Sequence, residues 1–154
     1  MPHIHEKIDW TVDTFIVHDN TVLLRWHDKY DNWLGVGGHV ELDEDPNAAA
    51  IREAKEEVGL DIVLQCPYAL PTEKQDNFTE LVPARFLNRH RVNESHEHIA
   101  LIYFATSKTN TVVPDESSDR SDTWKWATKE DLETMSLKPD IKFYCLRALE
   151  ELAN

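Results

Sequence analysis

The sequence predicts an α/β fold built around a mixed sheet. Short segments rich in β-branched and aromatic residues alternate with turn signals, which is typical of strands. A helix with its own start and stop signals lies between two of these segments, giving the order strand, loop, helix, strand. A chain of 154 residues has the length of one domain, so we expect residues 1–154 to form a single domain.

The first predicted strands form a hairpin. Apolar and β-branched residues from Trp10 to Val17 are followed by Asp19 and Asn20, which favour a turn, and the pattern resumes over residues 21–26. A polar stretch over residues 27–32 then leads to three glycines, Gly35, Gly37 and Gly38. Glycines in such a loop permit a close approach by a ligand or by another part of the chain.

The central helix is predicted by its ends. The Asp45 side chain can accept a hydrogen bond from a helical N–H, and proline, here Pro46, is tolerated at the first helical position. We expect this helix to run to about Val58 and to end at Gly59 in the left-handed conformation. Residues 60–64 follow as a predicted buried strand.

The second half of the chain is predicted to supply further strands, a surface loop and two helices. Residues 78–91 and 99–106 are predicted strands joined by the polar segment 92–97, and residues 109–122 are a predicted mobile loop. Trp124 and Trp126 alternate on a short strand, and Thr128 with Asp131 resembles a capping box that starts a helix through residue 135. The last helix begins at Pro139, with an apolar face formed by Ile141, Tyr144, Cys145 and Leu149.

Composition limits the range of functions. The 29 acidic and 16 basic residues give a net charge of −13, which disfavours binding to long nucleic acids. A small phosphate ester remains compatible with this charge if divalent cations neutralise both partners. The two cysteines, Cys66 and Cys145, indicate neither a disulfide framework nor a zinc cluster, and no targeting or membrane-spanning segment is evident. We therefore expect a cytoplasmic protein that does not associate with membranes.

Three glutamates of the central helix share one side of a helical wheel. At about 100° per residue, Glu53, Glu56 and Glu57 fall between about 240° and 340°, and the opposite arc carries Ala50, Ile51, Ala54 and Val58. Repulsion between the carboxylates would be relieved by a cation, and such oxygen ligands suit Mg²⁺ or Mn²⁺. The alternative is a charged helix face in solvent, which would not explain the fixed spacing to the glycine loop.

This segment resembles the Nudix box. The pattern is glycine, five residues, Glu, seven residues, Arg-Glu, an aliphatic residue, one residue, Glu-Glu, one residue, glycine, and an aliphatic residue. The matching positions are Gly38, Glu44, Arg52, Glu53, Glu56, Glu57, Gly59 and Leu60. Ala54 departs from the usual Ile, Leu or Val, which reduces packing but leaves every polar position in place. The box covers 23 residues, and residues 126–132 more loosely resemble the common Nudix ending.

The resemblance implies a Nudix-type α/β/α sandwich and a hydrolase that cleaves a nucleoside diphosphate linked to another moiety. It also implies that Glu53, Glu56 and Glu57 hold Mg²⁺ or Mn²⁺, that the Gly37 or Gly38 carbonyl adds a ligand, and that Arg52 orients a glutamate. Glu44 would brace the loop, with Gly38 and Gly59 as structural positions.

The general base is left open by the sequence. Glu56 or Glu57 could accept the proton of the attacking water within the helix. In many members of the family a glutamate from a distant loop or strand assists, and Glu97 and Glu94 are the candidates in this chain, although both are equally typical of solvated loop acids.

Basic residues outside the box are candidates for binding the substrate phosphates. Arg25 ends the second strand near the glycine loop. Arg89 and Arg91, together with Arg85 and His90, form the basic concentration of an acidic chain. An ordinary strand-end arginine and an exposed strand are the competing interpretations.

Three histidines have two interpretations. His96 and His98 alternate, which places both imidazoles on one strand face, and His90 could approach them, so the pattern is compatible with a second metal site. We favour the alternative, that they are polar strand residues or substrate contacts, since no cysteine lies close in sequence.

The substrate cannot be chosen from the box. A nucleoside triphosphate is the leading candidate, with ADP-ribose or a nucleotide sugar as rivals, and a second class is a catalytically silent domain that senses a nucleotide. Selectivity would depend on aromatic residues outside the box, such as Trp33, Phe78, Phe86 and Tyr103, each of which is more typical of a core position. The partner is expected to be a small nucleotide, and a homodimer is compatible with the sequence.

Overall fold

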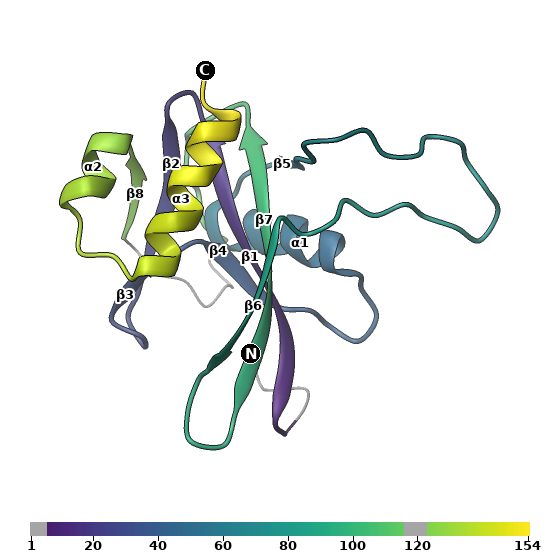
Figure 1. Ribbon diagram of the computed structural model, residues 1–154, viewed down its shortest axis with the longest axis horizontal. Helices are drawn as coiled ribbons and strands as arrows, with labels where there is room; N and C mark the ends of the chain where they lie inside the picture. Colours follow the sequence, from purple (N-terminus) through teal and green to yellow (C-terminus); the bar gives the residue numbers. More distant parts are fainter. Residues whose placement is uncertain (1–5, 116–122) are drawn as a thin grey trace.

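The computed structural model describes residues 6–115 and 123–154, which form an eight-stranded mixed sheet with helices on both faces (Figure 1). The α/β/α sandwich expected from the sequence is confirmed. Its elements are β1 (Ile8–His18), β2 (Thr21–His27), β3 (Asn32–Leu34), β4 (Val36–His39), α1 (Pro46–Val58), β5 (Ile62–Leu64), β6 (Phe86–Arg91), β7 (Glu97–Ser107), β8 (Trp124–Ala127), α2 (Lys129–Thr134) and α3 (Pro139–Leu152).

Two long strands form the centre of the sheet. β1 and β7 run parallel, from Ile8 opposite Glu97 to Val17 opposite Thr106. The other edge of β1 pairs antiparallel with β4 over residues 11–14 and with β2 at the hairpin. The other edge of β7 pairs antiparallel with β6 and then β5. A parallel pair needs a long connection, and the chain between β1 and β7 contains α1.

Alternation along the strands creates two apolar layers. Phe15 and Val17 of β1 pack with α3 residues in one cluster, whereas Ile16 packs with Ala54 and Val58 of α1 in another. The sheet is therefore covered by α1 on one face and α3 on the other, as Figure 1 shows. In the described part of the chain, no helix has both the length and the apolar composition required to cross a membrane.

Local signals at turns and helix ends are confirmed. Asp19 adopts a positive φ of 51° between β1 and β2. The Asp45 carboxylate accepts a hydrogen bond from the Ala48 N–H at 2.9 Å, and Gly59 ends α1 with φ 70°. Both hydrogen bonds of the capping box between Thr128 and Asp131 are present. These short-range features depend on neighbouring residues, which is why the sequence predicts them.

Two strand predictions are wrong in extent. The predicted buried strand over residues 60–64 is reduced to β5, in which Val63 is 60% exposed, because β5 lies at the sheet edge. The predicted strand over residues 78–91 begins only at Phe86, and residues 65–85 form an extended loop away from the sheet (Figure 1). Phe78 is half exposed in this loop rather than part of the core. The predicted mobile loop over residues 109–122 extends into residues 116–122, which lie outside the described residues.

The loop returns to the body at the start of α1. The side-chain amide of Asn47 donates to the Val82 carbonyl and accepts from the Val82 N–H, both at 2.8 Å. The same amide donates to the Tyr103 hydroxyl at 3.2 Å. One side chain therefore reproduces a strand-like pairing and fixes the loop against α1 and β7.

Candidate functional site

The guanidinium of Arg52 connects three glutamates of the box. It binds Glu44 through two nitrogens, with Nε to Oε2 at 3.0 Å and Nη2 to Oε1 at 2.6 Å. Its Nη1 donates to Glu53 at 2.9 Å and to Glu56 at 3.2 Å. Nη2 also donates to the backbone carbonyl of His39 at 3.1 Å. This planar fork fixes α1 relative to both β4 and the loop that carries Glu44, which a lysine could not do.

Glu57 is held by a separate set of donors. Arg25 of β2 places Nη2 3.1 Å from Oε1, and its Nε forms an ion pair with Oε2 at 3.0 Å, although that N–H is not aligned as a hydrogen bond. The backbone N–H of Gly37 donates to Oε2 at 3.1 Å. Both charged side chains are nearly fully buried, 7% exposed in each case. A desolvated pair of this kind holds its geometry firmly.

The two glycines of β4 leave room for these contacts. A Cβ at Gly38 would lie 2.3 Å from Oε1 of Glu53, and a Cβ at Gly37 would lie 1.9 Å from the backbone oxygen of Val12. The absence of side chains lets α1 press its carboxylates against β4. The predicted glycine loop is wrong at Gly37 and Gly38, which belong to strand β4, but the expected close approach is present: Gly38 packs against Glu53 and Gly37 against the Val12 backbone.

The predicted division of α1 into an acidic and an apolar arc is wrong in one respect. Glu53 and Glu57 are buried with the alanines on the sheet side, whereas Ile51 of the predicted apolar arc is 47% exposed. Burial is tolerated because Arg25, Arg52 and the Gly37 N–H supply donors. Only Glu56 of the three keeps a substantially accessible carboxylate, with its side chain 43% exposed.

Burial and ion pairing shift the pKa values of the glutamates in opposite directions. Burial raises the pKa of Glu57 well above its ordinary value, and Arg25 opposes this effect. Burial likewise raises the pKa of Glu53, against the influence of Arg52. Hydrogen bonds from Arg52 lower the pKa of Glu44. A nearby cation would therefore stabilise the charged forms of Glu53 and Glu57, whereas the charge of Glu44 is already compensated by Arg52.

The distant base candidate lies on a different part of the sheet. The carboxylate of Glu97 is bound by Arg89 through two contacts, at 2.8 and 2.9 Å, on the exposed β6–β7 hairpin. It lies four residues, about 13 Å, along β7 from Leu101, which packs near the start of α1. Arg89 and Glu97 therefore satisfy each other, which argues against both of their predicted roles.

The remaining predicted contacts are dispersed. Arg91 is exposed at the end of β6, and Arg85 forms an ion pair with Glu151 of α3. Arg25 is buried against Glu57, which favours a positioning role over direct contact with phosphate. Of the aromatic candidates, Trp33 and Phe86 pack at the edge of the α3-side core, and Tyr103 is buried on the α1 side.

Sequence reasoning missed Asp9, His39 and Asp13, although it had considered His96 and His98 for a second metal site. Asp9 and His39 lie beside His98, with ligand atoms of the three within 4.8 Å of one another. The sequence contains no signal for Asp9 and His39, because strands far apart in the chain bring them to His98. Asp13 is also buried: desolvation and then the charge of Asp140 raise its pKa to about 7, while Arg25 opposes the shift.

Comparison with known proteins identifies the family. The NUDIX domain model matches residues 8–146. The chain belongs to the Nudix hydrolase family. A Nudix-family hydrolase from Clostridium perfringens is 32% identical, with 92% of this chain and 96% of that chain covered and a TM-score of 0.81. A search of curated proteins gave no match.

More distant solved structures share the Nudix fold. The Ap4A hydrolase of C. elegans is 18% identical, with coverage of 92% and 95% and a TM-score of 0.67. An ADP-ribose pyrophosphatase from Streptococcus suis is 16% identical, with coverage of 92% and 90% and a TM-score of 0.57. Their different substrates show that the shared fold does not determine which compound a Nudix protein cleaves.

Proposed function

We propose that this Nudix hydrolase is a divalent-metal-dependent pyrophosphohydrolase whose substrate is a nucleoside diphosphate linked to another moiety. The observation that carries the proposal is the convergence of buried Glu53 and Glu57 with partly exposed Glu56 on one helix, fixed by Arg52 and Arg25. The three carboxylates are held close together, whereas on a helix face in solvent their repulsion would drive them apart.

Glu53, Glu56 and Glu57 are the proposed ligands of Mg²⁺, or of Mn²⁺ in its place, with the Gly37 carbonyl as a further candidate. Their oxygens are the hard donors that these ions prefer, and the raised pKa values of Glu53 and Glu57 reflect buried charge that a cation would stabilise. When bound, such an ion supplies charge neutralisation for the phosphates and a lower pKa for the attacking water.

The protein's own residues position these groups. Arg52 holds Glu53 and Glu56 against the Glu44 brace, and Arg25 with the Gly37 N–H orients Glu57. We assign proton acceptance to Glu56, because its carboxylate is the most accessible to water of the three. Glu56→Gln should lower kcat, whereas Glu97→Gln should leave kcat unchanged; the reverse pattern would restore the distant base.

A nucleoside triphosphate is the leading substrate, with ADP-ribose or a nucleotide sugar next. The name of one structural relative, an ADP-ribose pyrophosphatase, supports ADP-ribose, and the name of another, an Ap4A hydrolase, supports the wider class of linked nucleoside diphosphates. The net charge of −13 favours a small substrate that arrives with cations over a long nucleic acid. We further propose that residues 1–154 act as one domain in the cytoplasm, which is consistent with free Cys66 and Cys145.

The test is a substrate panel in Mg²⁺ with identification of every product. Wild type should cleave a phosphoanhydride bond in one substrate class, and chelation should abolish turnover until Mg²⁺ is restored. Glu53→Gln,Glu57→Gln serves as the inactive control, and Glu130→Gln, which is exposed on α2, serves as the active one. Tight nucleotide binding without turnover in either metal would reject the enzyme and favour the silent sensor.

A further inference from the structure

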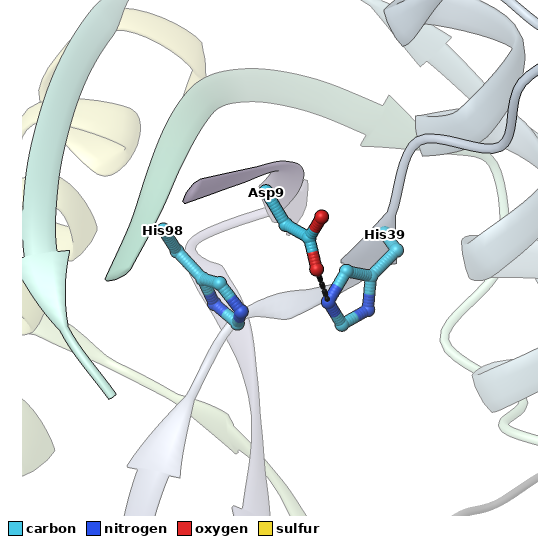
Figure 2. Close-up of side chains that lie close together, drawn as sticks. All are labelled: Asp9, His39 and His98. Carbon is cyan, nitrogen blue, oxygen red and sulfur yellow. Dashed lines mark ion pairs between the residues drawn. The ribbon is translucent and has the colours of Figure 1, made fainter. Parts of the chain in front are cut away.

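Asp9, His39 and His98 come together on the face of the sheet opposite α1. Within the ladders, Asp9 is paired with His98, and His39 with Thr11. Neighbouring Val12 packs against α1, so the alternation of the strand turns residues 9 and 11 to the other face. Figure 2 shows the two imidazoles on either side of the Asp9 carboxylate.

The separations within this cluster match those of metal ligands. Oδ2 of Asp9 lies 3.3 Å from Nε2 of His39, and the ligand atoms of all three residues fall within 4.8 Å of one another. In a tetrahedral zinc site with bonds of about 2.0 to 2.1 Å, neighbouring ligand atoms are roughly 3.3 Å apart. The Asp9–His39 separation therefore needs no adjustment, and His98 needs a shift of about 1.5 Å at most.

A fourth imidazole supports the same conclusion. Nε2 of His96 lies 3.3 Å from the same Oδ2 of Asp9. Its other ring nitrogen, Nδ1, lies 3.1 Å from the Glu6 carbonyl oxygen, which can only accept, so Nδ1 carries the proton. In the neutral ring this leaves the Nε2 lone pair facing a carboxylate. A metal-binding histidine is commonly oriented in this way, by donation from its second nitrogen to a carbonyl.

We propose that Asp9, His39 and His98 bind a transition-metal ion, with Zn²⁺ as the best fit, and that His96 is the adjacent imidazole able to complete the coordination. Imidazole nitrogen with one carboxylate oxygen suits Zn²⁺, whereas Mg²⁺ prefers oxygen ligands and water. Asp9, His96 and His98 are more than 90% buried, so these side chains lie in the interior of the protein rather than on its surface. It is chemically distinct from the all-carboxylate site on α1.

His39 links the two sites structurally. Its imidazole points to the Asp9 face, while its backbone carbonyl accepts the Arg52 hydrogen bond on the α1 side. A metal ion bound by His39 would fix the end of β4, where Gly37 and Gly38 contact the α1 glutamates. We therefore assign the ion a structural role, and its binding should raise the thermal stability of the protein.

The rival explanation is a cluster of histidines that only pairs with Asp9 within the fold, which predicts no tight binding of Zn²⁺. The experiment uses the untagged full chain, stripped with a chelator and returned to excess Mg²⁺ so that the α1 carboxylates are occupied. Zn²⁺ is then titrated against a chromophoric chelator, and Co²⁺ is added separately to record the visible spectrum of a low-coordinate site. Wild type should bind one equivalent of Zn²⁺, with a rise in Tm.

Variants locate the ion. His39→Ala,His98→Ala should weaken Zn²⁺ binding roughly 100-fold or more and abolish the Co²⁺ spectrum, since even outer residues of metal sites affect affinity 10- to 100-fold. Asp9→Asn preserves the volume and should also weaken binding, which covers the case of a misfolded double variant. His18→Ala is the matched control, since that imidazole contacts the Ser107 carbonyl elsewhere, and it should bind as wild type does.

Three results overturn the proposal. The first is an absence of Zn²⁺ binding by wild type in Mg²⁺, and the second is unchanged binding in both the double variant and Asp9→Asn. Loss of binding in Glu53→Gln,Glu56→Gln alone would place the ion on α1 instead. None of these outcomes depends on turnover, so the proposed zinc site can be rejected without rejecting the proposed hydrolase activity, and the reverse is also true.

Discussion

Replacing Arg25 with Met would test whether the buried pair with Glu57 holds the site together. The substitution keeps much of the aliphatic side chain and removes the guanidinium that contacts both oxygens of Glu57. Removing one partner of a buried ion pair typically costs about 3–5 kcal/mol, because the other charge stays buried without compensation. We expect about 3 kcal/mol here, since the Gly37 N–H still donates to Glu57.

For a domain of this size, about 3 kcal/mol corresponds to a Tm lowered by roughly 6 to 12 °C. The loss should depend on pH. Burial raises the folded-state pKa of Glu57, and removing Arg25 raises it further. An acid whose pKa is higher in the folded state stabilises the protein fully at pH values below its pKa in the unfolded state, 4.5. This stabilisation is lost as the pH rises through its pKa in the folded state. The difference in free energy of unfolding between wild type and Arg25→Met should therefore become smaller when the pH is lowered from 7 to 5.

The assay is urea unfolding of wild type, Arg25→Met, Glu57→Gln and the double variant at both pH values. The double variant should be more stable than the sum of the single effects predicts, because neither charge is left alone. Arg147→Met is the matched control: its ion pairs with Glu150 and Glu151 are exposed, and its loss should cost no more than about 1 kcal/mol. Additive effects, or a deficit that does not change with pH, would refute the argument.

Three further predictions concern the same region. Gly38→Ala places a Cβ against Glu53 and should raise the Mg²⁺ concentration needed for half-maximal turnover about tenfold, measured by metal titration. Arg52→Lys cannot reproduce the fork to Glu44 and should lower kcat about 10- to 100-fold with little change in KM, measured by steady-state kinetics. Burial raises the Asp13 pKa from 3.8 to about 7, so the free energy of unfolding of wild type should fall by up to about 4 kcal/mol from pH 4 to pH 8, relative to that of Asp13→Asn. Unfolding curves at both pH values measure this difference.

Features determined by neighbouring residues were predicted accurately from the sequence. The Asp45 cap, the Gly59 end of α1 and the Thr128 capping box each involve groups within a few positions of one another. The box itself places Glu53, Glu56 and Glu57 on one helix, so the composition of the candidate site also followed. Local hydrogen bonding and helical geometry were sufficient for these predictions.

Features that depend on tertiary pairing were not predicted. The strand proposed from residue 78 failed because the backbone of residues 65–85 finds few partners in the sheet, and Asn47 provides the anchor for Val82 instead. The burial of Glu53 and Glu57 was missed because a helical wheel does not include Arg25, a residue of another element. Propensity and periodicity describe one segment at a time, whereas these outcomes depend on which segments meet.

The short strand β4 contributes to the candidate sites on both faces of the sheet. Gly37 donates its N–H to Glu57, Gly38 leaves space for Glu53, and the His39 carbonyl accepts from Arg52. These three contacts use backbone atoms or the absence of a side chain, so they leave the His39 imidazole available to the opposite face, where it meets Asp9. Because strand side chains alternate while backbone groups stay in place, one segment can orient the α1 carboxylates and contribute to a separate cluster. The glycines are needed for the first task alone, and the histidine serves both.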